Sequence, residues 1–390
     1  MFKNLKVKYE KKVIIGLSGG VDSSVAAFLL KKAGYEVEGV FMRNWDSSLN
    51  YDIEGNPFVN NNICPQEQDF SDALKVAEQL DIKCHKVDFS EDYWNQVFTS
   101  FLNSLKANLT PNPDVLCNNK IKFDTFVKYV EQFNPDYIAM GHYARIIYKN
   151  KEIILAKAFD RDKDQTYFLS QLKTEQLKKV LFPLGELTKK QVREIAVKEN
   201  LITAKKKDST GICFIGERNF FVFLNNYLNT NKGPIKDMNG VFLKEHEGVI
   251  KYTIGQRKRL NLKVTKENQS PWFVVGKDLK NNILYVDQNA ESPYLYSDSA
   301  LIIDVVWRNC EGYIYKKNAR MEIEAKFRYR QPNQEVEIIF LNENTIKIYY
   351  PQKIKLVTPG QVCSFYKGDF CLGAGIIKTV YSQNKKMLYV

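Results

Sequence analysis

The first 141 residues alternate between two hydrophobic periods. Short apolar runs at 13–17 (VIIGL) and 36–42 (EVEGVFM) are typical of buried strands. Between them, VDSSVAAFLLKKAG places Val25, Phe28 and Leu29 on one face of a helix. Strands that alternate with helices in this way run parallel and are joined by right-handed crossovers. The pattern therefore predicts a doubly wound α/β domain around a parallel sheet.

The same alternation extends beyond this first unit. It predicts further helices at 69–82, 91–109, 172–181, 188–200 and 217–228, strands at 83–89 and 136–144, and a hairpin at 145–159. Ligands of doubly wound sheets bind beyond the carboxyl ends of the strands. We therefore expect the functional residues of this part of the chain to follow its strands.

The pattern changes after Gly233 and Pro234, where short alternating runs are separated by Asn, Gly and Pro turns. The clearest runs are 271–279, 282–288, 300–307, 321–331, 335–341 and 345–350. Such runs predict a β-barrel or a β-sandwich. With boundaries near 218 and 290, we expect domains at 1–218, 219–290 and 291–382 and a polar tail at 383–390.

Composition indicates a globular protein outside membranes. The 390 residues are 44% hydrophobic and 26% charged, and no apolar run approaches the ~20 residues that cross a bilayer. The basic N-terminal residues lead directly into a strand, so we expect a cytoplasmic location. The net charge of +12 suits a polyanion such as RNA, DNA or an acidic membrane surface. AT-biased coding, which enriches lysine, asparagine and isoleucine, explains that charge equally well.

Cysteine and histidine usage bears on metals and disulfides. Seven cysteines are spread along the chain without a CxxC pair, and the three histidines form no HExxH spacing. This usage argues against a disulfide framework and against a thiolate zinc or iron–sulfur site. We therefore expect no structural metal, and individual reactive thiols remain as the interesting possibility.

Residues 18–24, SGGVDSS, form the strongest local motif and lie between an expected strand and an expected helix. The two glycines allow backbone N–H groups to point inward as an anion nest, the serine hydroxyls add donors, and the helix presents its positive end. The motif therefore predicts a phosphate site. It differs from the Walker A loop and from the dinucleotide fingerprint, and a plain glycine turn with a serine cap is the alternative.

Two cysteines have neighbours that could activate a thiol. Asp114 and Cys117 lie three residues apart in NPDVLCNNKIKF and share one face if a helix begins there. A thiol near a helix start and near Lys120 and Lys122 has a lowered pKa and becomes a nucleophile. The second thiol, Cys213, lies in a glycine-bounded stretch after three lysines. Taken alone, each cysteine is also explained by an inert, half-buried residue.

The SGGVDSS loop resembles the PP-loop of the ATP pyrophosphatases, which cleave ATP between its α and β phosphates. The loop alone does not choose among the members of that superfamily. Further segments, in order along nearly the whole chain, resemble the tRNA-specific 2-thiouridylases: FMRNWD, TPNPDVLCNNKIKF, GHYAR, DQTYFLS, FPLGELTKKQVREIA, AKKKDSTGICFIGER, YTIGQRK, PWFVV, FRYRQ and VTPGQVCSFYKGDFCLGAGII.

This resemblance implies a fold, an activity and partners. The fold would be a PP-loop, adenine nucleotide alpha hydrolase-like α/β domain, followed by a small central β-rich domain and a C-terminal β-barrel. The activity would be ATP-dependent thiolation at C2 of the wobble uridine of tRNA. ATP would be the substrate, with Mg²⁺, and the partners would be tRNA and a sulfur-donor protein that carries a persulfide.

The resemblance also implies roles for individual residues. The ATP phosphates would be bound by Gly16, Leu17, Ser18, Gly19, Gly20, Val21, Asp22 and Ser23, and the adenosine would be flanked by Met42 and Gly141. The target base would meet Asn112, Pro113 and Asp114, and other parts of the tRNA would meet Lys163, Asp164, Gln165, Arg328 and Tyr329. Asp114 would be the acid/base group. Cys213 would receive the persulfide, and Cys117 would be the partner nucleophile.

Two other functions remain as alternatives. An amide-forming synthetase of the same superfamily would use ammonia, but the chain shows no glutaminase domain, and Asp114, Cys117 and Cys213 would have no role in it. A non-catalytic RNA-binding module could keep a degenerate nucleotide fold, although the intact SGGVDS motif argues against this. Formation of AMP in the presence of tRNA distinguishes these functions.

Overall fold

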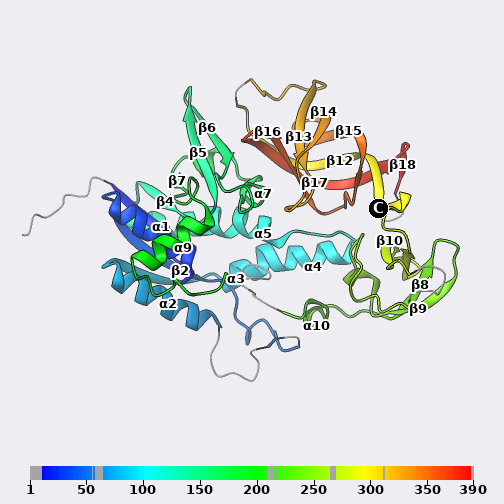
Figure 1. The fold of residues 1–390 in the computed structure, drawn as a ribbon, viewed down its shortest axis with the longest axis horizontal. Helices are drawn as coiled ribbons and strands as arrows, with labels where there is room; N and C mark the ends of the chain where they lie inside the picture. The colour runs from blue at the N-terminus through cyan, green and yellow to red at the C-terminus, as the bar shows by residue number, and fades with distance from the viewer. Residues whose placement is uncertain are drawn as a thin grey trace, which may run out of the picture. The chain divides into compact units, whose positions relative to one another are not determined.

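The computed structural model describes residues 11–54, 56–57, 65–208, 215, 218–263, 269–310 and 312–387 (Figure 1). The chain divides into two compact units. The first contains Met1–Val97, Leu116–Arg218 and Asp369–Cys371, and the second contains Phe98–Val115, Asn219–Gly368 and Leu372–Val390. The predicted domain boundaries near 218 and 290 stay predictions.

The first unit is built on a five-stranded sheet in the order β3-β2-β1-β4-β7. Its strands are β1 (Lys12–Gly16), β2 (Glu36–Arg43), β3 (Lys83–Asp88), β4 (Tyr137–Ala139) and β7 (Val180–Leu181). All neighbouring strands pair in parallel, which confirms the predicted doubly wound sheet. The strand order reverses between β1 and β4, and sheets of this kind bind ligands at such a reversal, so we expect the ligand beside the end of β1.

Helices cover this sheet because each buries one apolar face. In α1 (Val21–Lys32), Val25, Ala26 and Leu30 are buried, while Phe28 and Leu29 pack partly exposed against the same core. The helix lies beside α9 (Lys189–Lys198) (Figure 1). The remaining elements of this unit are α2 (Pro65–Gln79), α3 (Ser90–Tyr93), η2 (Cys117–Thr125), α6 (Phe126–Val130), η3 (Glu131–Phe133), β5 (Ala144–Lys149), β6 (Glu152–Lys157), α7 (Thr166–Leu169) and α8 (Thr174–Leu177).

Three sequence predictions in this part need correction. The expected helix at 172–181 is only the short α8, because Val180 and Leu181 form β7 and pair with Ile138 and Ala139 of β4. The expected strand at 136–144 contains β4 only at its start, and its last residue begins β5. The expected helix at 91–109 is divided into α3, the π-helical η1 (Trp94–Phe98) and α4 (Thr99–Lys106).

The second unit contains a small sheet and a closed barrel. The small sheet has the order β10-β11-β8-β9, with β8 (Gly233–Asp237), β9 (Phe242–His246), β10 (Phe273–Asp278) and β11 (Ile283–Asp287). The barrel strands are β12 (Tyr296–Trp307), β13 (Arg320–Lys326), β14 (Gln334–Asn342), β15 (Thr345–Lys355), β16 (Val362–Lys367) and β17 (Phe370–Ser382). Because β12 pairs with both β15 and β17, the six strands close into the barrel rather than the sandwich.

Short helical elements complete the second unit. They are α5 (Pro113–Leu116), α10 (Phe220–Phe223), η4 (Leu224–Asn226), η5 (Val249–Lys251) and η6 (Pro293–Leu295). The Phe98 ring lies 5.9 Å from that of Phe223 and 4.8 Å from that of Tyr227. The Thr110 N–H donates to the Pro359 carbonyl at 2.9 Å. These contacts explain why 98–115 pack with the second unit.

A buried lysine in β10 makes the stability of the small sheet sensitive to pH. Lys277 is 4% exposed, its Nζ donates to the Tyr252 carbonyl at 3.1 Å, and burial lowers its pKa to about 8. The pKa in the unfolded chain is near 10.5, so the protonated lysine destabilises the fold below pH 8. This cost fades as the pH rises from about 8 towards 10.5.

We therefore expect Lys277→Met to stabilise the protein at pH 7 by about 1 to 3 kcal/mol and to flatten the pH dependence of stability between pH 8 and 10.5. Urea unfolding of the full chain at several pH values measures this. Lys244→Met, which replaces an exposed lysine of β9, is the matched control. If Lys277→Met lowered the free energy of unfolding at pH 7, the conclusion that the buried, protonated Lys277 destabilises the fold would be wrong.

Candidate functional site

The SGGVDSS loop connects β1 to α1 at the point where the strand order reverses. Gly19 has a φ of +70°, and a Cβ there would lie 2.2 Å from the Asp69 carbonyl oxygen, so only glycine fits. Gly20 precedes α1 in an extended conformation, and no side chain caps the helix. The first N–H groups of α1 therefore have no capping side chain, which is the arrangement that binds anions.

Serine hydroxyls fix the shape of this loop from within. The Ser18 N–H donates to Ser23 Oγ at 3.1 Å, and Ser23 Oγ donates to the Gly20 carbonyl at 3.1 Å. Ser24 Oγ donates to the same carbonyl at 2.8 Å. Ser18 is exposed, whereas Ser23 and Ser24 are buried. The loop is therefore rigid before any ligand arrives, with one hydroxyl open to solvent.

The structure brings the expected adenosine residues to the same end of the sheet. A Cβ on Gly16 would lie 3.2 Å from Met42 Cε, and a Cβ on Gly141 would lie 3.0 Å from the Ser23 amide nitrogen. These residues come from the ends of β1 and β2, from the start of α1 and from the chain after β4. Leu17 and Val21, also expected around the phosphates, are buried beneath the loop.

An ion-pair network lies beside the loop. Lys189 Nζ contacts Asp22 Oδ1 at 2.7 Å and Asp208 Oδ1 at 2.8 Å, and Tyr143 donates its hydroxyl to Asp22 at 2.9 Å. Burial, followed by the charge of Asp22, raises the pKa of Tyr143 far above its usual value. The tyrosine therefore stays a neutral donor. Because Asp22 accepts from both side chains, its carboxylate is oriented at the start of α1.

A second lysine donates a hydrogen bond to the backbone of the loop. Lys206 Nζ donates to the Gly19 carbonyl at 3.0 Å and to Asp69 Oδ1 at 2.7 Å. Desolvation lowers the pKa of Lys206, but its hydrogen bonds to Asp69 and Asp72 outweigh this and raise it overall. Sequence reasoning assigned no site role to Lys189, and it expected the lysine run 205–207 only to supply positive potential near Cys213. The only signal was their position in TKKQVREIA and in the lysine run before Cys213.

The segment expected to meet the target base begins a helix in the second unit. Asn112 Oδ1 accepts hydrogen bonds from the N–H groups of Asp114 (3.2 Å) and Val115 (3.3 Å), so it caps α5. Pro113 is the first residue of α5, where a missing N–H costs nothing. Asp114 is half-buried. The structure thus confirms that a helix begins before Cys117.

Of the two expected thiols, only Cys117 is among the described residues. Cys117 starts η2 in the first unit and is fully buried. Cys213 lies outside the described residues. Five residues after it, Arg218 donates to Asp52 at 2.8 Å, and both side chains are almost completely buried. A buried ion pair with this geometry costs several kcal/mol to break, so Arg218 is a fixed point of the chain.

The expected tRNA contacts lie in two places. Lys163 Nζ lies 3.4 Å from Asp208 Oδ2 at the surface of the first unit. Asp164 and Gln165 bond inward, since Asp164 accepts from the Ala158 N–H (3.0 Å) and Gln165 accepts from the Tyr143 N–H (2.9 Å). Direct contact of these three residues with tRNA stays a prediction.

The other two expected contacts belong to the second unit. Arg328 Nη2 donates to Thr358 Oγ1 at 2.8 Å, and Tyr329 beside it is half-buried. The run from Arg328 to Arg330 follows β13, and in it Arg328 and Tyr329 are half-buried while Arg330 is exposed. Contact of Arg328 and Tyr329 with tRNA also stays a prediction.

The described part of the chain offers neither a metal cluster nor a membrane-spanning helix. Within those residues, no group of three or more His, Cys, Asp or Glu side chains could hold a metal ion. Among the same residues, no helix has the length and apolar character needed to span a bilayer.

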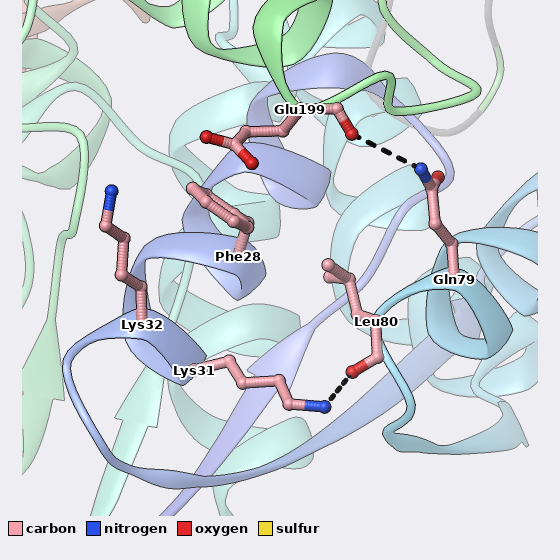
Figure 2. Close-up of a pocket in the computed structure, with 6 residues that line it drawn as sticks. All are labelled: Phe28, Lys31, Lys32, Gln79, Leu80 and Glu199. Atoms are coloured by element: carbon pink, nitrogen blue, oxygen red, sulfur yellow. Dashed lines mark hydrogen bonds between the residues drawn. The ribbon is translucent and has the colours of Figure 1, made fainter.

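A cavity of about 460 Å³ lies away from the loop (Figure 2). Its lining residues are Phe28, Lys31, Lys32, Gln79, Leu80 and Glu199. These residues belong to the carboxyl ends of α1, α2 and α9, where Lys31 donates to the Leu80 carbonyl. In a parallel sheet, helix carboxyl ends lie opposite the carboxyl ends of the strands, so this cavity is separate from the SGGVDSS site.

Three family models match consecutive parts of the chain. The tRNA methyl transferase HUP domain matches residues 11–217, the tRNA methyl transferase PRC-barrel domain matches 222–288, and the Aminomethyltransferase beta-barrel domain matches 299–377. Together these matches describe an α/β domain, a middle domain and a C-terminal barrel, in agreement with the sheet topology.

Named relatives match over nearly the full length. The tRNA-specific 2-thiouridylase MnmA of Phytoplasma australiense is 63% identical, with 97% of this chain and 100% of the relative covered. The same enzyme of Acholeplasma laidlawii is 56% identical, with 97% and 100% covered. The solved structure of NMN synthetase from Francisella tularensis is 21% identical, covers 52% of this chain and 67% of its own, and has a TM-score of 0.31.

The close packing of Gly19 makes a direct test of the anion site. In Gly19→Ala, the new Cβ would strike the Asp69 carbonyl and force the backbone from its positive φ, so the N–H groups would turn away from the ligand. We expect release of pyrophosphate from ATP to fall by about a hundredfold or more.

Gly240→Ala is the matched control, because Gly240 has a φ of +85° and nothing within 4 Å of its Cβ position. It carries the same backbone strain without the clash. Normal pyrophosphate release in Gly19→Ala would show that the loop does not bind the phosphates.

Proposed function

This chain belongs to the tRNA-specific 2-thiouridylase family, and we propose that its SGGVDSS site activates the wobble uridine of tRNA for thiolation at C2. The observation that carries this proposal is the anion cradle at the switch point of the sheet, in a chain whose sequence also carries the family's target-base and thiol motifs. The products would be 2-thiouridine, AMP and pyrophosphate.

ATP is needed because the C2 carbonyl of uracil is a weak electrophile with a poor leaving group. We assign Gly16–Ser23 to the phosphates, and Met42 and Gly141 to the adenosine. The C2 oxygen would attack the α phosphorus, and pyrophosphate would leave while held by the loop amides. Mg²⁺ would accompany the phosphates, as it does in most ATP sites. The C2 oxygen then departs as part of AMP.

Sulfur would reach C2 through the two thiols. The Cys213 thiolate attacks the outer sulfur of a donor protein's persulfide, and the donor thiolate leaves. The outer sulfur on Cys213 then attacks C2, and AMP leaves. Next, Cys117 attacks the Cys213 sulfur, and the electron pair of the broken S–S bond stays on the sulfur at C2. A disulfide between the two cysteines remains, which a dithiol reductant must reopen. Asp114 is the proposed proton acceptor at the base.

Methyl transfer, which two family-model names mention, fits the site less well. It requires neither an ATP phosphate cradle nor a pair of thiols. Mass spectrometry of tRNA nucleosides after reaction with ATP and a sulfur source separates the two functions, because replacing oxygen by sulfur and adding a methyl group give different masses. A methylated product without 2-thiouridine would overturn the proposal.

Substitution of single cysteines tests the two thiol roles. Cys213→Ser cannot accept sulfur and is expected to be inactive, whereas Cys117→Ser is expected to accept labelled sulfur yet fail to release 2-thiouridine. Labelled protein and labelled tRNA are measured separately.

Cys84→Ser is the control for these cysteine variants, because burial raises the pKa of the Cys84 thiol to about 11 and leaves it inert. Sulfur trapped only on Cys117, or full activity in either of the first two variants, would contradict the assigned roles.

Salt dependence tests the RNA interface. We propose that Lys163, Arg328 and Tyr329 contact the tRNA, where the wobble base must be splayed out of its stack. If phosphate contacts dominate, the log of the binding constant falls by about 0.7 to 0.9 per phosphate for each log unit of salt.

Lys163→Met is expected to reduce that slope by about one. Lys190→Met, which removes an exposed lysine of α9, should leave it unchanged. Filter binding at several salt concentrations measures both variants. If the binding constant of the unmodified protein for tRNA did not change with salt, the net charge of +12 would reflect coding bias rather than an RNA interface.

A further inference from the structure

Three large apolar side chains stand in solvent on the loop that follows β2. Leu49, Tyr51 and Ile53 are 71%, 72% and 62% exposed, whereas Asn50 and Asp52 between them are 6% and 1% exposed. We call residues 49–53 the apolar loop. Single exposed apolar side chains are common on protein surfaces. Several of them on one short segment are unusual, and such a cluster is typical of an interaction site.

The apolar loop is held in place by its polar residues. Asp46 Oδ1 accepts from the N–H groups of Ser48 (2.8 Å) and Leu49 (3.1 Å), and Asn50 Oδ1 accepts from the Asp46 N–H at 3.0 Å. The Asp52 N–H donates to the Ser47 carbonyl at 2.9 Å. The apolar side chains are thus presented by a preorganised scaffold, which lowers the entropic cost of binding a partner.

The same loop is tied to the segment that carries Cys213. Asp52 accepts from Trp45 Nε1 at 3.0 Å and from Arg218 Nη2 at 2.8 Å. Arg218 follows Cys213 by five residues, and five extended residues span at most about 18 Å. Whatever path the intervening residues take, the thiol therefore remains within reach of a protein seated on the apolar loop.

The charge of this region favours a protein over RNA as the occupant. Residues 44–74 contain no lysine or arginine, although the chain has 57 of them. The acidic residues of this stretch are Asp46, Asp52, Glu54, Glu67, Asp69 and Asp72. Four cations reach the stretch from outside, and each is bonded to its carboxylates: Arg43 to Asp46, Arg218 to Asp52, Lys86 to Glu67, and Lys206 to Asp69 and Asp72. A phosphate backbone requires cations at its contacts, whereas a basic protein with an apolar patch complements this surface.

We propose that the apolar loop is the docking surface for the protein that delivers sulfur as a cysteine persulfide. This inference rests on the proposed function, since it concerns the partner of the same site. The outer sulfur moves from the donor cysteine to Cys213 and the donor thiolate leaves, so the donor must be held close to this segment. Apolar contacts at Leu49, Tyr51 and Ile53 hold it there.

The test compares two donors that carry the same persulfide chemistry. One is a cysteine desulfurase supplied with L-cysteine. The other is glutathione persulfide, which has no protein surface. In full-length Leu49→Ser/Tyr51→Ser/Ile53→Ser, we expect the KM for the desulfurase to rise by about tenfold or more. The rate with glutathione persulfide should stay within about twofold of the unmodified protein.

Val197→Ser, at a position 61% exposed on α9 of the same unit, is the matched control and should change neither donor reaction. Single Leu49→Ser and Ile53→Ser variants replace the triple variant if it melts early. Equal losses with both donors, an unchanged KM for the desulfurase, or weakened tRNA binding would each overturn the inference, the last by assigning the loop to RNA. Absence of 2-thiouridine with both donors in the unmodified protein would overturn the proposed function itself.

Discussion

The geometry of the site depends on one lysine that holds two carboxylates from distant parts of the chain. Lys189 joins Asp22, at the start of α1, to Asp208, which directly precedes the segment that carries Cys213. With only 14% of its side chain exposed, this cation is poorly screened by water, so both carboxylates are firmly bound. The phosphate loop and the start of the thiol segment therefore share a single fixed point. Displacement of either one is expected to alter the other.

The sheet and the loop could be predicted because their signals are local. Buried parallel strands appear as continuous apolar runs, and SGGVDSS lies between such a run and a helical pattern. Local signals failed at Val180 and Leu181, where lysine, glutamine and leucine favoured a helix. Pairing with Ile138 and Ala139 outweighs that preference, and such pairing is set by tertiary structure. The sequence pattern therefore predicted the fold class but missed the fifth strand.

The candidate site also combines residues that have a local sequence signal with residues that only the tertiary structure brings together. The glycines and serines of the loop could be predicted as site residues from the sequence, because a phosphate site needs backbone N–H groups and hydroxyls at adjacent positions. Lys206 contacts Gly19 across 187 positions, and Lys189 contacts Asp22 across 167. Nothing in a single sequence pairs residues so far apart. The resemblance supplied Asp164 and Gln165 as RNA contacts, whereas the structure adds their inward hydrogen bonds, which shape the loop that presents Lys163.

The net charge of +12 does not show which surfaces attract ATP and which attract tRNA, whereas the positions of the charged residues do. Near the loop, Lys189 and Lys206 are already bonded to carboxylates, so the attraction for ATP phosphates comes mainly from backbone N–H groups and the start of α1. The stretch at 44–74 contains no lysine or arginine, and the cations that reach it from outside are bonded to its carboxylates, so it attracts phosphate poorly as well. The positive charge that attracts tRNA must therefore lie on other surfaces. The proposed function requires a nucleotide, an RNA and a sulfur donor to bind the same protein. The separation of charge suits that requirement, because each partner would then be attracted by a different physical feature.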